Sequence, residues 1–259
     1  MFKQLRVLVL LYVLVFVAAG QLLATMRSTD WDNTLWVDIH PVNGDGRPAT
    51  QHYLDGLNAQ EFAPIEKFFA AEAGRYGLAL SAPFRLNVAE QYRGSLPALQ
   101  TGASPLATIW WSLKMRWVTA GLSWSSDGPS PDIVVFAVFH EGGDSMALDR
   151  STALRKGLIA VANLFAVPRA SGSNQMVVAH ELLHTLGATD KYSLVNDYPR
   201  FPDGFADPNA TPLVPQAKAE IMAGRIPVDD RRAEIPDSLR RVVVGSVTAT
   251  EIGWLDEKR

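Results

Sequence analysis

The chain has 259 residues, of which 47% are hydrophobic and 20% are charged, and its formal net charge is −3. This composition suits one globular domain or two small ones and excludes a disordered polyelectrolyte. Because no strongly basic surface is indicated, we expect no nucleic-acid partner. The absence of cysteine excludes disulfides, Cys-ligated zinc, iron–sulfur clusters and thiol catalysis.

An uncharged apolar segment lies next to the N-terminus. Residues 7–26 read VLVLLYVLVFVAAGQLLATM and follow Lys3 and Arg6. About twenty helical residues span about 30 Å, the thickness of the hydrocarbon core of a bilayer. We expect residues 1–27 to be either a hydrophobic helix that anchors the chain with its N-terminus inside, or a signal peptide cleaved near Ala18–Gly20. Both alternatives place the second predicted domain, residues 28–259, outside the cytoplasm, either membrane-anchored or secreted.

The spacing of apolar residues predicts the elements of the soluble part. In chain order they are a strand at 36–42, a turn at 43–46, a helix at 59–76, a strand at 84–88, a helix at 106–120, a strand at 132–140, a strand (or a helix) at 157–165, a helix at 174–186, a loop at 190–215 and a helix at 247–255. We expect Ser173 or Asn174 to cap the helix at 174–186. The stripe Ile109, Trp110, Leu113 and Trp117 is expected to pack in the core, and a binding stripe is the alternative. This order of elements predicts a single α+β domain.

The motif AHELLHTLGATDKY carries the candidate chemistry. His180 and His184 lie four residues apart, so both imidazoles project from one face of a helix and can reach one metal ion. Glu181 lies beside them, where it can act as a general base toward water. Gly187 can end the helix in the left-handed conformation, which lets the chain return and bring Asp190 to the same ion. The sequence therefore predicts a catalytic zinc site with three protein ligands and one open position. A structural zinc site and a coincidental pair of surface histidines are the alternatives.

The pattern HExxHxxGxxD resembles the metzincin zinc metallopeptidases, in the variant found in snapalysin-type proteases where aspartate replaces the third histidine. The resemblance covers residues 174–225 and implies a zincin-like fold with a twisted mixed sheet, an active-site helix and a small irregular C-terminal part. It also implies that Met222, in AEIMAGR, forms the methionine turn beneath the metal. Some metzincins carry a tyrosine two residues later, where this chain has Gly224; Tyr192 is the nearest candidate for that role. The chain also resembles an uncharacterised group of bacterial membrane-associated proteins that share HELLHTLGATDKY and AEIMAGRIP.

Several alternatives stay open at this point. Glu220 is an alternative third ligand, by analogy with the downstream glutamate of gluzincins. Asp197, Asp203 and Asp207 can hold calcium, although turn aspartates of a solvated loop are the simpler interpretation. His140, Glu141 and Asp144 can line a cleft or form an ordinary turn. In metzincins an edge strand above the active-site helix aligns the substrate by main-chain pairing, and the resemblance implies this part for the strand from Gly157 or the strand from Asp132.

The function expected from the motif is that of an extracytoplasmic zinc-dependent endopeptidase, with a peptide or protein as substrate. One alternative is a zinc hydrolase acting on a non-protein amide such as peptidoglycan. Another is a membrane-tethered binding module without turnover, against which the intact Glu181 argues. The oligomeric state is not indicated by the sequence.

Overall fold

The computed structural model describes residues 28–98, 104–125, 130–142, 152–154 and 158–255, together with Arg6 and Tyr12. The expected N-terminal hydrophobic helix lies outside these residues, apart from the two isolated positions. Within the described part of the chain, no helix combines the length and the apolar character needed to cross a bilayer.

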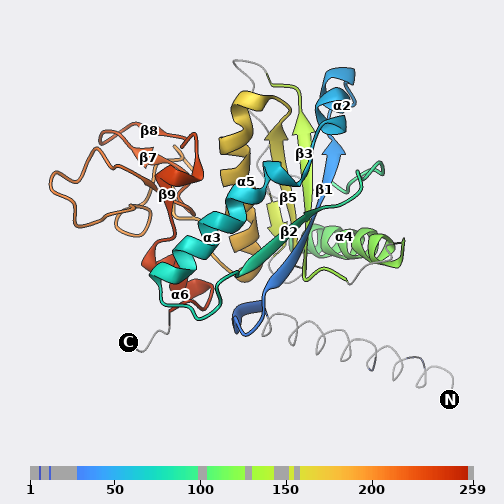
Figure 1. Cartoon of the computed structure of the whole chain (residues 1–259), viewed down its shortest axis with the longest axis horizontal. Helices are drawn as coiled ribbons and strands as arrows, with labels where there is room; N and C mark the ends of the chain where they lie inside the picture. The colour runs from blue at the N-terminus through green and yellow to red at the C-terminus, as the bar shows by residue number, and fades with distance from the viewer. Residues whose placement is uncertain are drawn as a thin grey trace.

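A five-stranded sheet forms the centre of the molecule (Figure 1). Its strands are β1 (Leu35–Asn43), β2 (Phe84–Val88), β3 (Ile133–His140), β4 (Thr152–Leu154) and β5 (Ile159–Phe165). Their order is β2-β1-β3-β5-β4, in which the first four are mutually parallel and β4 pairs antiparallel with β5. The sheet is therefore mixed, as expected, and the chain forms one domain. The expected α+β class was wrong: the domain is α/β, because parallel neighbours need crossover connections and helices supply them between β1, β2 and β3. The strands from Asp132 and Gly157, expected to pair with a substrate, instead lie inside the sheet, whose edges are β2 and β4.

Five α-helices occur in the described residues: α2 (Pro48–Asp55), α3 (Ala63–Arg75), α4 (Pro105–Ser125), α5 (Ser171–Leu186) and α6 (Ser246–Glu251). The helix expected at 59–76 is a short 3-10 turn, Ala59–Glu61, followed by α3. Helix α6 is shorter than expected, and neither α2 nor β4 was predicted. Three residues of β4 are too few for a period to be read, and Pro48 begins α2 at a position where its missing N–H costs nothing.

Helices pack against both faces of the sheet. Alternate residues of β1, β3 and β5 point to opposite sides, and Val37, Val135 and Ala162 belong to the larger core, which includes buried residues of α3 and α5. The opposite side chains, such as Val134 and Phe136, contact α4 in a smaller core. Helices α3 and α5 thus cover one face and α4 covers the other (Figure 1).

Helix α4 turns a different side to the sheet from the one expected. Trp111 and Met115 are its buried residues, whereas Trp110 is 62% exposed and Trp117 is 83% exposed. The expectation that the stripe Ile109, Trp110, Leu113 and Trp117 packs in the core was therefore wrong. The helix carries two apolar stripes, and the sheet buries the one formed by Trp111, Met115, Val118 and Leu122.

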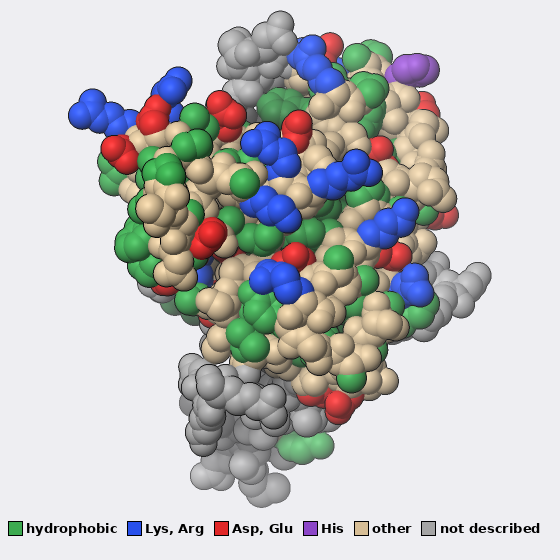
Figure 2. Space-filling model, turned by 60° about the vertical axis from the view of Figure 1, so that its left-hand side comes forward, with side chains coloured by type: hydrophobic (Ala, Val, Ile, Leu, Met, Phe, Trp, Pro, Cys, Tyr) green, Lys and Arg blue, Asp and Glu red, His purple; other side chains and the backbone are tan. Residues whose placement is uncertain are grey.

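The C-terminal part is small and irregular, as expected. Before α6 it contains a 3-10 turn, Leu239–Arg241, and four two-residue strands: β6 (Ala219–Glu220), β7 (Ile226–Pro227), β8 (Ala233–Glu234) and β9 (Val242–Val243). Residues 190–215 form no helix and no strand, only isolated bridges such as Tyr192 to Pro199. Figure 2, turned so that the side of these loops comes forward, shows Lys and Arg side chains spread over this face with Asp and Glu between them.

Candidate metal centre

Helix α5 presents the two histidines at its C-terminal end. It begins at Ser171, three residues earlier than expected, and no side chain caps it. The prediction that Ser173 or Asn174 caps the helix was wrong, because the Asn174 side chain bonds both N and O of Phe165 and so fastens α5 to β5. The helix ends at Gly187, whose φ of 112° is the left-handed conformation that glycine adopts without strain.

The turn at Gly187 brings Asp190 back to both histidines. Its Oδ1 atom lies 3.3 Å from Nε2 of His180 and 3.0 Å from Nε2 of His184. Ligand atoms in a tetrahedral zinc site, each about 2.0–2.1 Å from the ion, lie about 3.3 Å apart. Asp190 therefore lies at close to the ligand-to-ligand spacing of a zinc site from each of the two histidines.

The other ring nitrogen of each histidine is held by a backbone carbonyl. Nδ1 of His180 donates to the carbonyl of Ile221 at 2.9 Å, and Nδ1 of His184 donates to that of Ala188 at 2.8 Å. In the neutral form of each ring these bonds leave the lone pair on Nε2, as is usual for histidines that bind metal. Sequence reasoning missed both carbonyls, because no residue type marks a backbone acceptor.

Glu181 is 4% exposed, and its Oε2 has no hydrogen-bond partner. A buried carboxylate oxygen without a partner is costly and calls for a ligand or a water. Ligand atoms of His180, Glu181 and His184 lie within 4.8 Å of one another. Asp190 is not part of this group, and it is linked to the site by its contacts with the two histidines. These residues fit a metal ion, although the geometry alone does not identify which ion.

The pKa values of His180 and Asp190 are shifted so that a positive charge beside Asp190 is favoured. Burial opposes protonation of His180, but its hydrogen bond to Asp190 and the charge of Glu181 raise its pKa to about 9. Burial would raise the pKa of Asp190, yet hydrogen bonds from both imidazoles hold it well below its ordinary value. Burial raises the pKa of Glu181. The charged forms of His180 and Asp190 therefore stabilise each other in the metal-free site.

Glu220 is engaged elsewhere. It is fully buried, its Oε1 accepts from Gly245 N and from the Thr248 hydroxyl, and its Oε2 accepts from Ala223 N. Burial raises its pKa although these bonds act in the opposite direction. Since both oxygens already have donors within the C-terminal part, the geometry favours Asp190 as the third ligand.

The turn that carries Met222 touches two parts of the candidate centre. Met222 is fully buried, and its carbonyl accepts from the N–H of Lys191, next to Asp190. The preceding residue, Ile221, supplies the acceptor for His180. The turn therefore supports both the helix and the returning loop. Tyr192 pairs with Pro199 through a backbone bridge, and its proposed catalytic part stays a prediction.

The remaining sequence candidates lie apart from this cluster. The Asp197 carboxylate is 3.7 Å from the Arg225 guanidinium, and Oδ1 of Asp207 accepts from the backbone N–H of Asn209. With Asp203 they form no group of converging ligand atoms in the described residues, so the geometry gives calcium no support. His140 contacts Asn163, and Glu141 pairs with Arg47. Asp144 lies outside the described residues.

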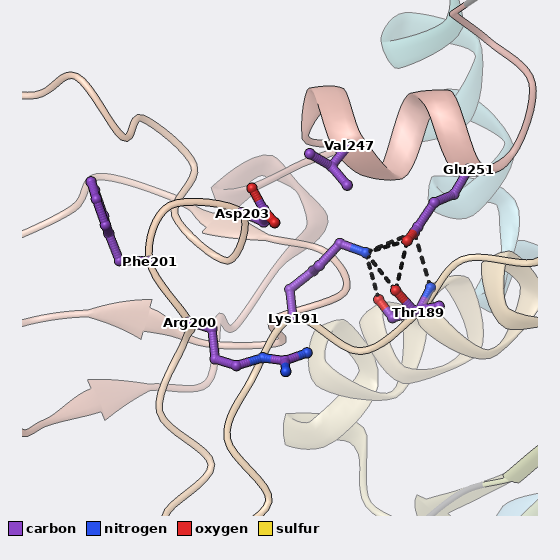
Figure 3. Close-up of a pocket in the computed structure, with 7 residues that line it drawn as sticks. All are labelled: Thr189, Lys191, Arg200, Phe201, Asp203, Val247 and Glu251. Atoms are coloured by element: carbon purple, nitrogen blue, oxygen red, sulfur yellow. Dashed lines mark hydrogen bonds and ion pairs between the residues drawn. The ribbon is translucent and has the colours of Figure 1, made fainter. Parts of the chain in front are cut away.

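A polar pocket of about 340 Å³ adjoins the loop that carries Asp190 (Figure 3). Within it the Lys191 side chain, 5% exposed, points to Glu251 and Thr189. No sequence pattern indicates the pair of Lys191 and Glu251, because the two residues lie on distant segments. The lining residues are Thr189, Lys191, Arg200, Phe201, Asp203, Val247 and Glu251.

A scan of models of known protein families gives no match, and a comparison with curated protein sequences gives none either. The function of the chain is therefore inferred from the motif and from the geometry of the site.

Proposed function

We propose that the chain is an extracytoplasmic zinc-dependent endopeptidase of metzincin type. The observation that carries the proposal is the convergence of His180, His184 and Asp190 beside the unpartnered Oε2 of Glu181. The left-handed Gly187 and the buried turn at Met222 support the same assignment, since the metzincin resemblance implies both. Anchoring by residues 1–27, or their removal as a signal peptide, belongs to the proposal as well.

His180, His184 and Asp190 would hold the ion, with one position left for water and substrate. When bound, zinc supplies a Lewis acid that polarises a carbonyl and makes water more acidic. Oε2 of Glu181 accepts the proton of the attacking water and returns it to the leaving amine. The raised pKa of Glu181 suits this exchange, because a base that also acts as an acid works best when its pKa lies close to the working pH. The carbonyls of Ile221 and Ala188 keep both imidazoles aligned throughout.

The test is the metal content of the purified full chain by elemental analysis, with His184→Ala as control. We expect about one zinc per chain, lost in the control, and cleavage of a peptide library by the zinc-loaded protein. Failure to bind zinc after reconstitution would overturn the proposal. Zinc binding with cleavage of peptidoglycan amides alone would instead establish the non-protein hydrolase.

A further inference from the structure

Helix α4 exposes an apolar stripe between Leu106 and Trp117. Leu106 is 78% exposed, Trp110 62%, Leu113 53% and Trp117 83%. Their spacing of four, three and four residues places all four on one side of the helix. The opposite side is already buried against the sheet through Trp111 and Met115. The stripe is therefore surplus to the core, and large exposed apolar surfaces of this kind mark interaction sites.

The composition of α4 points to a lipid partner. Residues 105–125 contain no Asp or Glu and carry Lys114 and Arg116. Lys114 is exposed beside the stripe, with Nζ 5.7 Å from the centroid of the Trp110 ring. Tryptophan and leucine bordered by basic side chains are typical of helices that lie in the interface of a bilayer, where the ammonium group can meet lipid phosphate.

The position of α4 in the fold agrees with this partner. It is the one described helix on its side of the sheet, whereas α3 and α5 cover the other (Figure 1). Trp36, 55% exposed, alternates with the core residues Leu35 and Val37 of β1 and so points to the α4 side. The apolar run of residues 7–26 precedes this strand by only a short segment. The strand that carries Trp36 on the α4 side thus lies close in sequence to residues 7–26, the segment proposed to enter the membrane.

We propose that the α4 stripe, Leu106, Trp110, Leu113 and Trp117, docks the domain on the surface of a phospholipid bilayer. The proposal goes beyond the peptidase assignment and does not depend on it, because no residue of the stripe belongs to the metal centre. Docking would fix the orientation of the domain at the membrane instead of leaving it free on a tether.

The absence of cysteine in the chain allows a direct test, since one introduced cysteine is the only site for a nitroxide label. The full chain is reconstituted in vesicles of phosphatidylcholine and phosphatidylglycerol with Leu113→Cys or Trp117→Cys. Val195→Cys is the matched control, because Val195 is an apolar residue that is 94% exposed in a distant loop. Collision of each label with oxygen, which concentrates in lipid, is compared with collision with a water-soluble nickel complex.

We expect the oxygen-to-nickel ratio to be at least several-fold higher at positions 113 and 117 than at 195. Adding Leu113→Glu to the Trp117→Cys chain should return the label to water. Equal ratios at all three positions, or protein left in the supernatant of the vesicles, would overturn the proposal. Protection from both reagents with dipolar broadening between labels would also overturn it, in favour of a second copy on this face. Zinc content, measured on the same samples, reports separately on the peptidase assignment.

Discussion

Nζ of Lys191 lies 2.7 Å from both carboxylate oxygens of Glu251, and this pair fastens the loop that carries Asp190 to helix α6 (Figure 3). Thr189, on the other side of Asp190, donates to the same carboxylate through its N–H and its hydroxyl. The residues on both sides of the proposed ligand are therefore held by one acidic side chain. The pair therefore positions Asp190 without belonging to the candidate metal centre.

We predict that Glu251→Gln lowers the free energy of unfolding by about 2–3 kcal/mol near neutral pH, because Lys191 is left buried without a counter-charge. Burial would raise the pKa of Glu251, but the bonds from Lys191 and Thr189 lower it below its ordinary value of 4.5. The carboxylate therefore stabilises the fold above about pH 4.5, and this contribution is lost as the pH falls through its folded-state pKa. Urea titrations at pH 7 and pH 3 measure both effects.

The matched control is Glu234→Gln, which removes an exposed carboxylate in β8 and should change the unfolding free energy by less than about 0.5 kcal/mol. A Glu251→Gln chain as stable as the control at pH 7 would contradict the positioning role.

Glu181→Gln should keep about one zinc per chain and lower the rate of peptide cleavage by about 10²–10⁴-fold, since the amide cannot accept a proton. Elemental analysis and a peptide assay on the same preparation separate binding from chemistry. Glu61→Gln is a suitable control, because Glu61 also has a buried oxygen without a partner, outside the cluster. Retained activity in Glu181→Gln would remove Glu181 from the role of general base.

Asp190→Ala should weaken zinc binding on the order of 100-fold or more, since loss of a ligand costs more than loss of a group that orients one. Glu220→Gln should leave zinc affinity unchanged but destabilise the fold by about 1–3 kcal/mol, because its amide nitrogen would face backbone or hydroxyl donors. Competition with a chromogenic chelator measures affinity for both variants. The reverse pattern, with zinc lost in Glu220→Gln alone, would make Glu220 the ligand.

The candidate centre was predictable from the sequence because its geometry is local. His180 and His184 share a helix, and Gly187 fixes the return of the chain to Asp190 within one short turn. The partners that orient these side chains were not predictable. Ile221 contributes only a backbone carbonyl, and Glu251 reaches Lys191 across sixty residues of chain.

The fold also has parts that the sequence predicts well and parts that it does not. Long periodic segments such as α5 and β3 were predicted with small errors at their ends, because burial of one face decides them. The side of α4 that meets the sheet was predicted wrongly, because periodicity identifies apolar stripes but cannot say which one the sheet buries. Trp110 and Trp111 are neighbours in sequence and differ completely in environment.

The two stripes of α4 give a final prediction. Trp111 is 5% exposed, belongs to the smaller core and donates from its Nε1 to the carbonyl of Pro97 at 2.8 Å. Trp111→Ala should therefore cost about 3–5 kcal/mol of unfolding free energy, the range for removing a buried aromatic side chain. Trp117→Ala, on the exposed stripe, should change it by less than about 0.5 kcal/mol in detergent solution. Denaturant titrations followed by near-ultraviolet circular dichroism compare the two variants. A larger loss for Trp117→Ala would mean that α4 packs through the opposite stripe, and the docking face would then be the wrong one.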